Sequence, residues 1–84
     1  MGVMLKKVKE SFKNCNVYEF DNYVMVAGKF DTHFMKVSAG YGQRTYCVII
    51  TEHGDSDNVL YRGTCSRSLD FVIAEAQKML TKLK

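Results

Sequence analysis

The sequence predicts a two-layer α+β domain, in which two helices pack on one face of a four- or five-stranded antiparallel meander sheet. Two observations predict this fold. Apolar residues recur at helical spacing near both ends of the chain, in residues 3–13 and from Leu69 onwards. Between these segments, runs of β-branched and aromatic residues are separated by short turns rich in Asp, Asn and Gly. A chain of 84 residues without an internal repeat or linker makes one domain, residues 1–84.

The first helix is predicted over residues 3–13, with lysines on the side opposite its apolar stripe. Asn14 and Asn16 predict its end, because Asn tolerates the left-handed conformation common at helix C-termini. The apolar stripe consists of Met4, Leu5, Val8 and Phe12.

A hairpin is predicted next, with strands over Val17–Phe20 and Tyr23–Phe30 joined by a turn at Asp21 and Asn22. A second turn is expected at residues 31–33, followed by a strand over Phe34–Ala39. Residues 40–43 then predict a flexible turn, because two of the four are glycine.

The strand predicted over Arg44–Thr51 is the central one, because its β-formers have apolar side chains pointing to both faces. A polar loop of about seven residues is expected over Glu52–Asn58. The chain then returns in a short strand over Val59–Arg62.

The last helix is expected after Gly63–Ser68, with Ser66 or Ser68 as its N-cap. Asp70 falls in its first turn, where negative charge suits the helix dipole. Its apolar stripe consists of Leu69, Val72, Ile73, Ala76, Leu80 and Leu83. The predicted order is therefore α-β-β-β-β-α, with one more strand if the first hairpin closes.

Both faces of the predicted sheet are apolar or aromatic, yet two short helices can cover only one of them. One interpretation is that the second face is partly exposed and pairs with another copy or with a partner. The other is that sheet curvature and tyrosine hydroxyls make this face acceptable to water. The sequence leaves both interpretations open.

Three cysteines without a CxxC pair, and the absence of an Asn-x-Ser/Thr acceptor, favour a reducing cytoplasmic location over a disulfide scaffold. The N-terminal residues lack the apolar region of a signal peptide. No apolar run reaches the roughly 20 residues that a membrane helix needs.

Catalytic, cofactor and metal sites are not expected. Cys65 near a helix N-terminus, with His53 or His33 as base, is the one candidate for an enzyme, but nothing in the sequence brings a histidine to it. The polar loop lacks the glycine and closing glutamate of a calcium loop, so it is interpreted as a solvated turn.

Basic charge gathers at the two ends of the chain. Residues 1–13 contain four lysines and one glutamate, and residues 64–84 contain four basic and two acidic side chains. If both helices pack on one face, their outer sides present a basic surface, with Tyr41 and Tyr46 as stacking groups. The alternative is that these lysines only keep the helices soluble.

The order of elements is similar to that of the double-stranded RNA-binding domain, in which the last strand leads into Gly-x-Gly-x-Ser followed by lysines. Gly63, Ser66 and Arg67 match this pattern after a one-residue gap. Cys65 replaces the second glycine, and Ser68 and Asp70 stand where basic residues are expected. The likeness spans about a dozen residues, and we assign no family from it.

The sequence therefore predicts a small non-enzymatic regulatory or inhibitor protein, of the plain type that includes phage-encoded accessory proteins. It is expected to bind a larger protein through an apolar sheet face, with basic helices steering an acidic surface. RNA binding through the helical face is the second hypothesis, and a homodimer through the sheet is a further possibility. The expected binding residues are Lys6, Lys9, Lys13, Arg44, Tyr46, Tyr61, Arg62, Arg67, Lys78 and Lys82.

Overall fold

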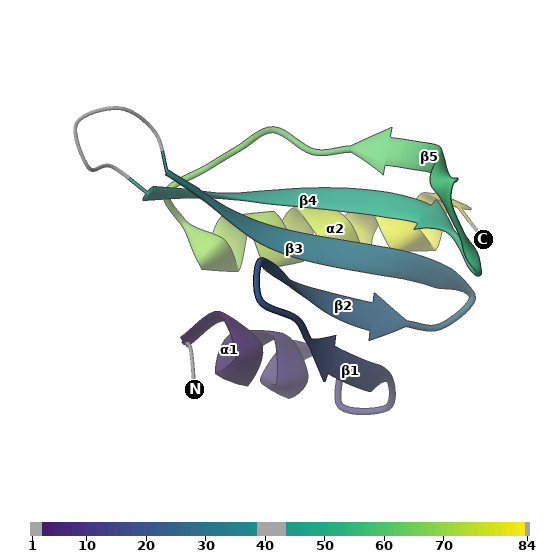
Figure 1. Cartoon of the computed structure of the whole chain (residues 1–84), viewed down its shortest axis with the longest axis horizontal. Helices are drawn as coiled ribbons and strands as arrows, with labels where there is room; N and C mark the ends of the chain where they lie inside the picture. Colours follow the sequence, from purple (N-terminus) through teal and green to yellow (C-terminus); the bar gives the residue numbers. More distant parts are fainter. Residues whose placement is uncertain (1–2, 39–43, 84) are drawn as a thin grey trace.

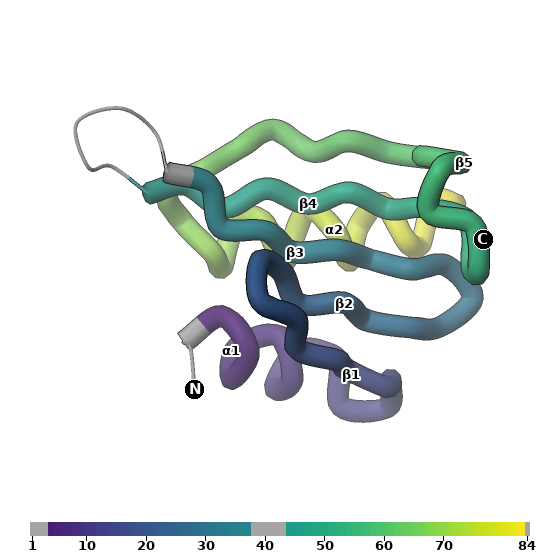
Figure 2. The backbone as a smooth tube through the Cα atoms, in the orientation of Figure 1, coloured from purple at the N-terminus to yellow at the C-terminus, as the bar shows by residue number. Residues whose placement is uncertain are grey.

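The computed structural model describes residues 3–38 and 44–83. A five-stranded antiparallel sheet runs in the order β1-β2-β3-β4-β5, preceded by one helix and followed by another. Figures 1 and 2 show both helices on the same side of this sheet, so neither described helix covers its other face. The predicted α+β class is confirmed. The elements are α1 (Val3–Ser11), β1 (Asn16–Glu19), β2 (Tyr23–Ala27), β3 (Phe30–Ser38), β4 (Arg44–Glu52), β5 (Asp55–Arg62) and α2 (Leu69–Leu83).

The strand β3 begins earlier than the sequence predicts. Residues 31–33 lie within the strand and pair with β4, so the expected turn there is wrong; the chain turns at Gly28 and Lys29 instead. Asp31 is tolerated in the strand because its carboxylate accepts hydrogen bonds from the turn that follows β4. The turn predicted at residues 40–43 lies outside the described residues.

The connection between β4 and β5 is a two-residue turn at His53 and Gly54, and the predicted seven-residue loop is wrong. Gly54 has a φ of 78°, a left-handed conformation that glycine adopts without steric cost. Its amide donates a hydrogen bond to Asp31 Oδ2 at 3.2 Å. Irregular pairing on either side of Thr51 accommodates the extra residues of β5.

The core lies between the helices and one face of the sheet. Phe34, at the centre of β3, is fully buried and contacts Phe12, with 5.9 Å between the ring centroids. Strand pairing places alternate residues of neighbouring strands on this same face. The buried apolar side chains of this core are Leu5, Val8, Phe12, Val24, Val26, Phe34, Val48, Ile50, Leu69, Val72, Ile73 and Ala76.

Polar contacts cap α2 and join it to α1. Ser68 is the N-cap of α2, as predicted, because its hydroxyl accepts a hydrogen bond from the amide of Phe71 at 3.2 Å. Lys7 Nζ forms an ion pair with Asp70 at 3.0 Å, and Gln77 donates to the carbonyl of Ser11 at 3.1 Å. Within the described residues, no helix is long and apolar enough to cross a membrane.

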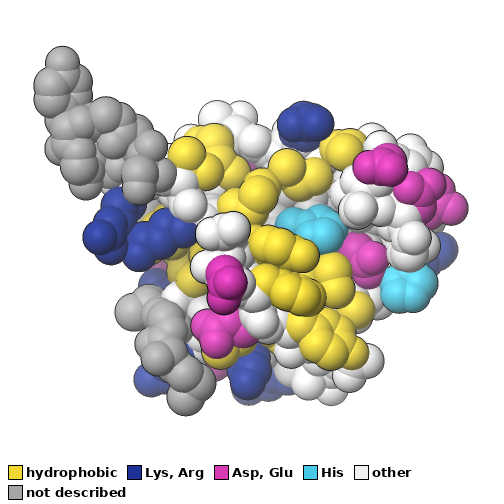
Figure 3. Space-filling view, viewed as in Figure 1, with side chains coloured by type: hydrophobic (Ala, Val, Ile, Leu, Met, Phe, Trp, Pro, Cys, Tyr) yellow, Lys and Arg dark blue, Asp and Glu magenta, His cyan; other side chains and the backbone are white. Residues whose placement is uncertain are grey.

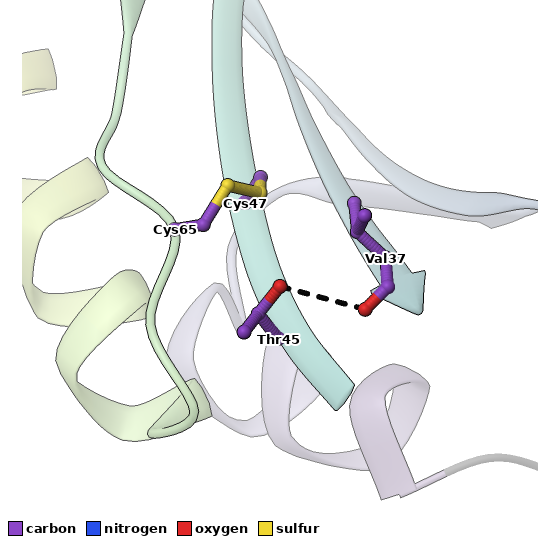
Figure 4. Close-up of a disulfide and its surroundings, with 4 residues drawn as sticks. All are labelled: Val37, Thr45, Cys47 and Cys65. Carbon is purple, nitrogen blue, oxygen red and sulfur yellow. Dashed lines mark hydrogen bonds between the residues drawn. A yellow bond between two sulfur atoms is a disulfide. The ribbon is translucent and has the colours of Figure 1, made fainter. Parts of the chain in front are cut away.

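Cys47 and Cys65 form a disulfide that joins β4 to the segment leading into α2 (Figure 4). This segment lies beside β4, because Tyr46 and Ser66 exchange two backbone hydrogen bonds of 2.7 and 3.0 Å. Cys15 is a free, exposed thiol. Because two of the three cysteines form a disulfide, the cysteine pattern no longer supports a reducing compartment. The cytoplasmic location stays a prediction.

Gly63 is the point where the chain leaves β5 against the core. Its amide donates to the carbonyl of Val48 at 2.8 Å. A Cβ atom on Gly63 would lie 2.6 Å from Val48 Cγ1 and 2.9 Å from Glu75 Oε1. Because Val48 is fully buried and β-branched, it cannot move aside easily.

We therefore expect Gly63→Ala to lower the free energy of unfolding by about 1–3 kcal/mol, as overpacked cores do. Chemical denaturation measures this loss. Gly28→Ala is the matched control, since the nearest atom to its added Cβ would be 3.9 Å away. Equal effects of the two substitutions would contradict the close packing at Gly63.

Candidate functional site

The uncovered face of the sheet, called the open face below, carries one row of side chains that crosses all five strands. Strand pairing aligns Tyr18, Met25, His33, Ile49 and Arg62 in this order from β1 to β5. Four of the five are apolar or aromatic, if the neutral imidazole is counted with them. The hydrophobic side chains seen across the sheet in Figure 3, with one histidine among them, belong to this face. The row is therefore a continuous apolar strip with a cation at one end.

A second row strengthens this strip on the side of the disulfide. Tyr23 pairs with Met35, and Met35 pairs with Cys47. Phe20 stacks on Tyr23 with ring centroids 4.6 Å apart. Tyr18, Phe20 and Val37 are 48%, 45% and 41% exposed, so a large part of this apolar surface contacts water.

Charged side chains are nearly absent from the paired positions of the open face. Alternation along the strands places Glu19, Lys36, Arg44 and Glu52 on the side covered by helices. The paired charged residues left on the open face are Arg62 and the buried Asp31.

His33 lies at the centre of the open face, third in the row of five. Its Nε2 is 3.2 Å from the Thr51 hydroxyl, and its ring is 5.5 Å from that of Tyr23. Burial lowers the pKa of His33 below its usual 6.5, although the nearby Asp31 carboxylate acts in the opposite direction. The imidazole is therefore neutral at physiological pH and fits an apolar surface.

A small polar cluster closes one end of the open face. The Asp31 carboxylate is 2.9 Å from His53 Nδ1 and also accepts the Gly54 amide. These contacts hold the turn between β4 and β5 onto β3. Across residues 3–38 and 44–83, no group of three or more His, Cys, Asp or Glu side chains is arranged to hold a metal ion.

The predicted enzyme candidate loses its nucleophile, because the sulfur of Cys65 is bonded to Cys47 and cannot act as a thiolate. Cys47 is buried, whereas Cys65 is exposed.

Two of the predicted binding residues, Tyr46 and Tyr61, lie on the side of the sheet covered by helices. Both pack against the core. The Tyr61 hydroxyl donates a hydrogen bond to Glu75, and this bond is the main reason why the pKa of Tyr61 is raised. Tyr46, with Arg44 and Lys36, lines a cleft of about 410 Å³ beside the turn between β1 and β2.

The predicted basic residues lie on both helices, on β4 and β5, and in the segments that follow α1 and precede α2. Lys9 and Lys13 line a depression with Phe12, Cys15 and Val17, on the flank of α1 next to β1. The lysine that faces α2 is Lys7, which is paired with Asp70. Six further predicted residues are exposed: Lys6, Arg44, Arg62, Arg67, Lys78 and Lys82.

Comparison with models of known protein families, with curated proteins and with solved structures found no match. The fold and the open face therefore define a class by their physical character alone. It is an α+β domain with helices on one sheet face and an exposed apolar strip on the other.

Proposed function

We propose that this protein is a small non-enzymatic regulatory or inhibitor protein that binds a larger protein through its open face. The observation that carries the proposal is the apolar row from Tyr18 to Ile49, which crosses the sheet on the side away from the two described helices (Figure 1). Protein interfaces are enriched in Tyr, Phe and Met and depleted of charge at their centres, and this surface has both properties.

The charge distribution supports a protein partner over a nucleic acid on this face. Phosphate binding needs several cations, because affinity for nucleic acid comes largely from neutralised phosphates. The row has Arg62 alone as a permanent cation. Exposed aromatic rings could stack on bases, but segment 14–63, which contains all five strands, holds six acidic and four basic residues. RNA binding through the exposed helix lysines stays the alternative.

The exposed lysines of α1 and α2 would assist a protein partner with an acidic surface. They lie on the side of the molecule opposite the open face or at its flanks, so they act at long range rather than in the contact itself. Such steering raises the association rate and weakens with added salt.

Affinity capture from extracts of the native cell tests this proposal, with and without nuclease. We expect Ile49→Glu, next to the centre of the row, to weaken partner capture about 30-fold or more, and Tyr18→Ala, at the end of the row, to weaken it less. Phe71→Glu is the matched control, because Phe71 is 53% exposed on the helical side. Nuclease is expected to have no effect.

Retention of the same partner by Ile49→Glu would overturn the proposal, once circular dichroism shows that the variant is folded. Loss of all bound material after nuclease treatment would favour the RNA alternative.

A further inference from the structure

The open face has the dimensions of a small dimer interface. Five strands about 4.8 Å apart span roughly 20 Å, and the seven residues of β3 from Asp31 to Val37 span about as much. With side-chain relief, each copy would bury roughly 500–600 Å². Two such faces bury about 1,000–1,200 Å² in total, which is at the lower limit for a specific interface.

The row of five is also self-complementary. His33 is its middle member, with Tyr18 and Met25 on one side and Ile49 and Arg62 on the other. A two-fold axis parallel to β3 would place β5 of one copy over β1 of the other. Arg62 of each copy then meets Tyr18 of the other, where a guanidinium attracts the face of an aromatic ring. The apolar Met25 and Ile49 meet in the same way, and no like charges oppose each other within this row. On β3, Asp31 of each copy faces Asp31 of the other, and each carboxylate is bonded to His53 and Gly54 of its own chain.

We infer that a second copy of this chain covers the open face in the free protein, as a symmetric dimer with His33 opposite His33, and that acidification separates the copies. This dimer uses the surface of the proposed function and so rests on it, since self-association and partner binding compete for one face. The dimer would therefore be the inactive form, and the monomer would bind the partner.

The groups around His33 determine the direction of the acid effect. Tyr23 faces it from β2, Thr51 from β4, and Arg62 stands beyond Ile49 at the β5 end of its row. Asp31, on β3 itself, is already bonded to His53. Strand pairing places His33 on the face of the sheet opposite the helices, which lie together on the other side (Figure 1). Asp31 is the one group here that favours the charged form.

Burial of His33 determines whether acid strengthens or weakens the dimer. Burial already lowers the pKa of His33 in one copy, and covering by a second copy removes more water from the imidazole. The dimer therefore binds fewer protons than two monomers do. Its stability is complete above the pKa of His33 in the monomer, which already lies below the usual 6.5, and is lost as the pH falls toward the still lower pKa in the dimer.

Sedimentation equilibrium of the purified chain tests the inference, over about 1–100 μM protein at about pH 7.5 and about pH 5.0. A Cys15→Ser background prevents disulfides between copies, because Cys15 is an exposed free thiol. We expect a dimer at the higher pH and at least tenfold weaker association at the lower pH. His33→Leu should remain dimeric at both, Ile49→Glu should be a monomer, and Phe71→Glu should behave as the parent chain.

A monomeric parent chain at the higher pH would overturn the inference; if that monomer still captures a partner through Ile49, the proposed function survives. A dimer that Ile49→Glu does not weaken uses another surface and also overturns it. An unchanged acid response in His33→Leu would show that His33 is not the switch.

Discussion

Replacing Phe34 by alanine is expected to lower the free energy of unfolding by about 3–5 kcal/mol. Phe34 is fully buried where the sheet meets the helices, and its ring contacts that of Phe12. A domain of this size has a total stability of only about 5–15 kcal/mol, so the variant should be close to unfolded at 37 °C. Urea denaturation followed by circular dichroism measures the loss.

Phe71→Ala is the matched control, since it removes the same side chain from the exposed surface of α2. It should change stability by less than about 1 kcal/mol. If the two variants lose equal stability, the core does not lie between the helices and the side of the sheet that carries Phe34. In that case the assignment of the open face also fails.

Reducing the Cys47–Cys65 disulfide is expected to lower the free energy of unfolding by about 3 kcal/mol. The bond closes a loop between residues 18 positions apart, and its main effect is to limit the conformations of the unfolded chain. Denaturation of a Cys15→Ser chain with and without reductant measures the difference on one sequence. Because Cys65 is exposed, a reductant can reach the bond.

Cys65→Ser is the control for this measurement. It should match the reduced chain and should not respond to reductant. An intact mass that corresponds to three free thiols in the native parent protein would contradict the disulfide. Equal stability of the oxidised and reduced chains would contradict the loop argument.

The hairpin between β4 and β5 shows why part of the fold escaped prediction. Residues 52–58 are polar and contain Gly54, which locally resembles a solvated loop. The chain turns after two residues because the Asp31 carboxylate, from a neighbouring strand, binds His53 and Gly54. The same carboxylate made residues 31–33 resemble a turn when they are part of β3.

Of the predicted binding residues, Arg62 lies in the row that crosses the open face. The sequence indicated that one apolar sheet face would stay uncovered. In β4, however, the two faces carry similar side chains. Tyr46, Val48 and Ile50 on one face are apolar β-formers, and Cys47, Ile49 and Thr51 on the other are also largely apolar β-formers, so the sequence does not indicate which face is covered. The predicted Tyr46 and Tyr61 therefore fell on the covered side, while His33 and Met35 were missed. Their alternation with buried Thr32 and Phe34 along β3 is the signal that identifies them.

Local sequence determined both helices, the choice of Ser66 or Ser68 as cap and the meander of strands, because helical spacing, capping and β-propensity act over a few residues. Only the tertiary structure decided which sheet face the helices cover, because that choice depends on strand pairing across the whole chain. It also brought together Cys47 and Cys65, and it placed His33 at the centre of the open face. These features depend on contacts between residues far apart in sequence, so local sequence patterns do not predict them.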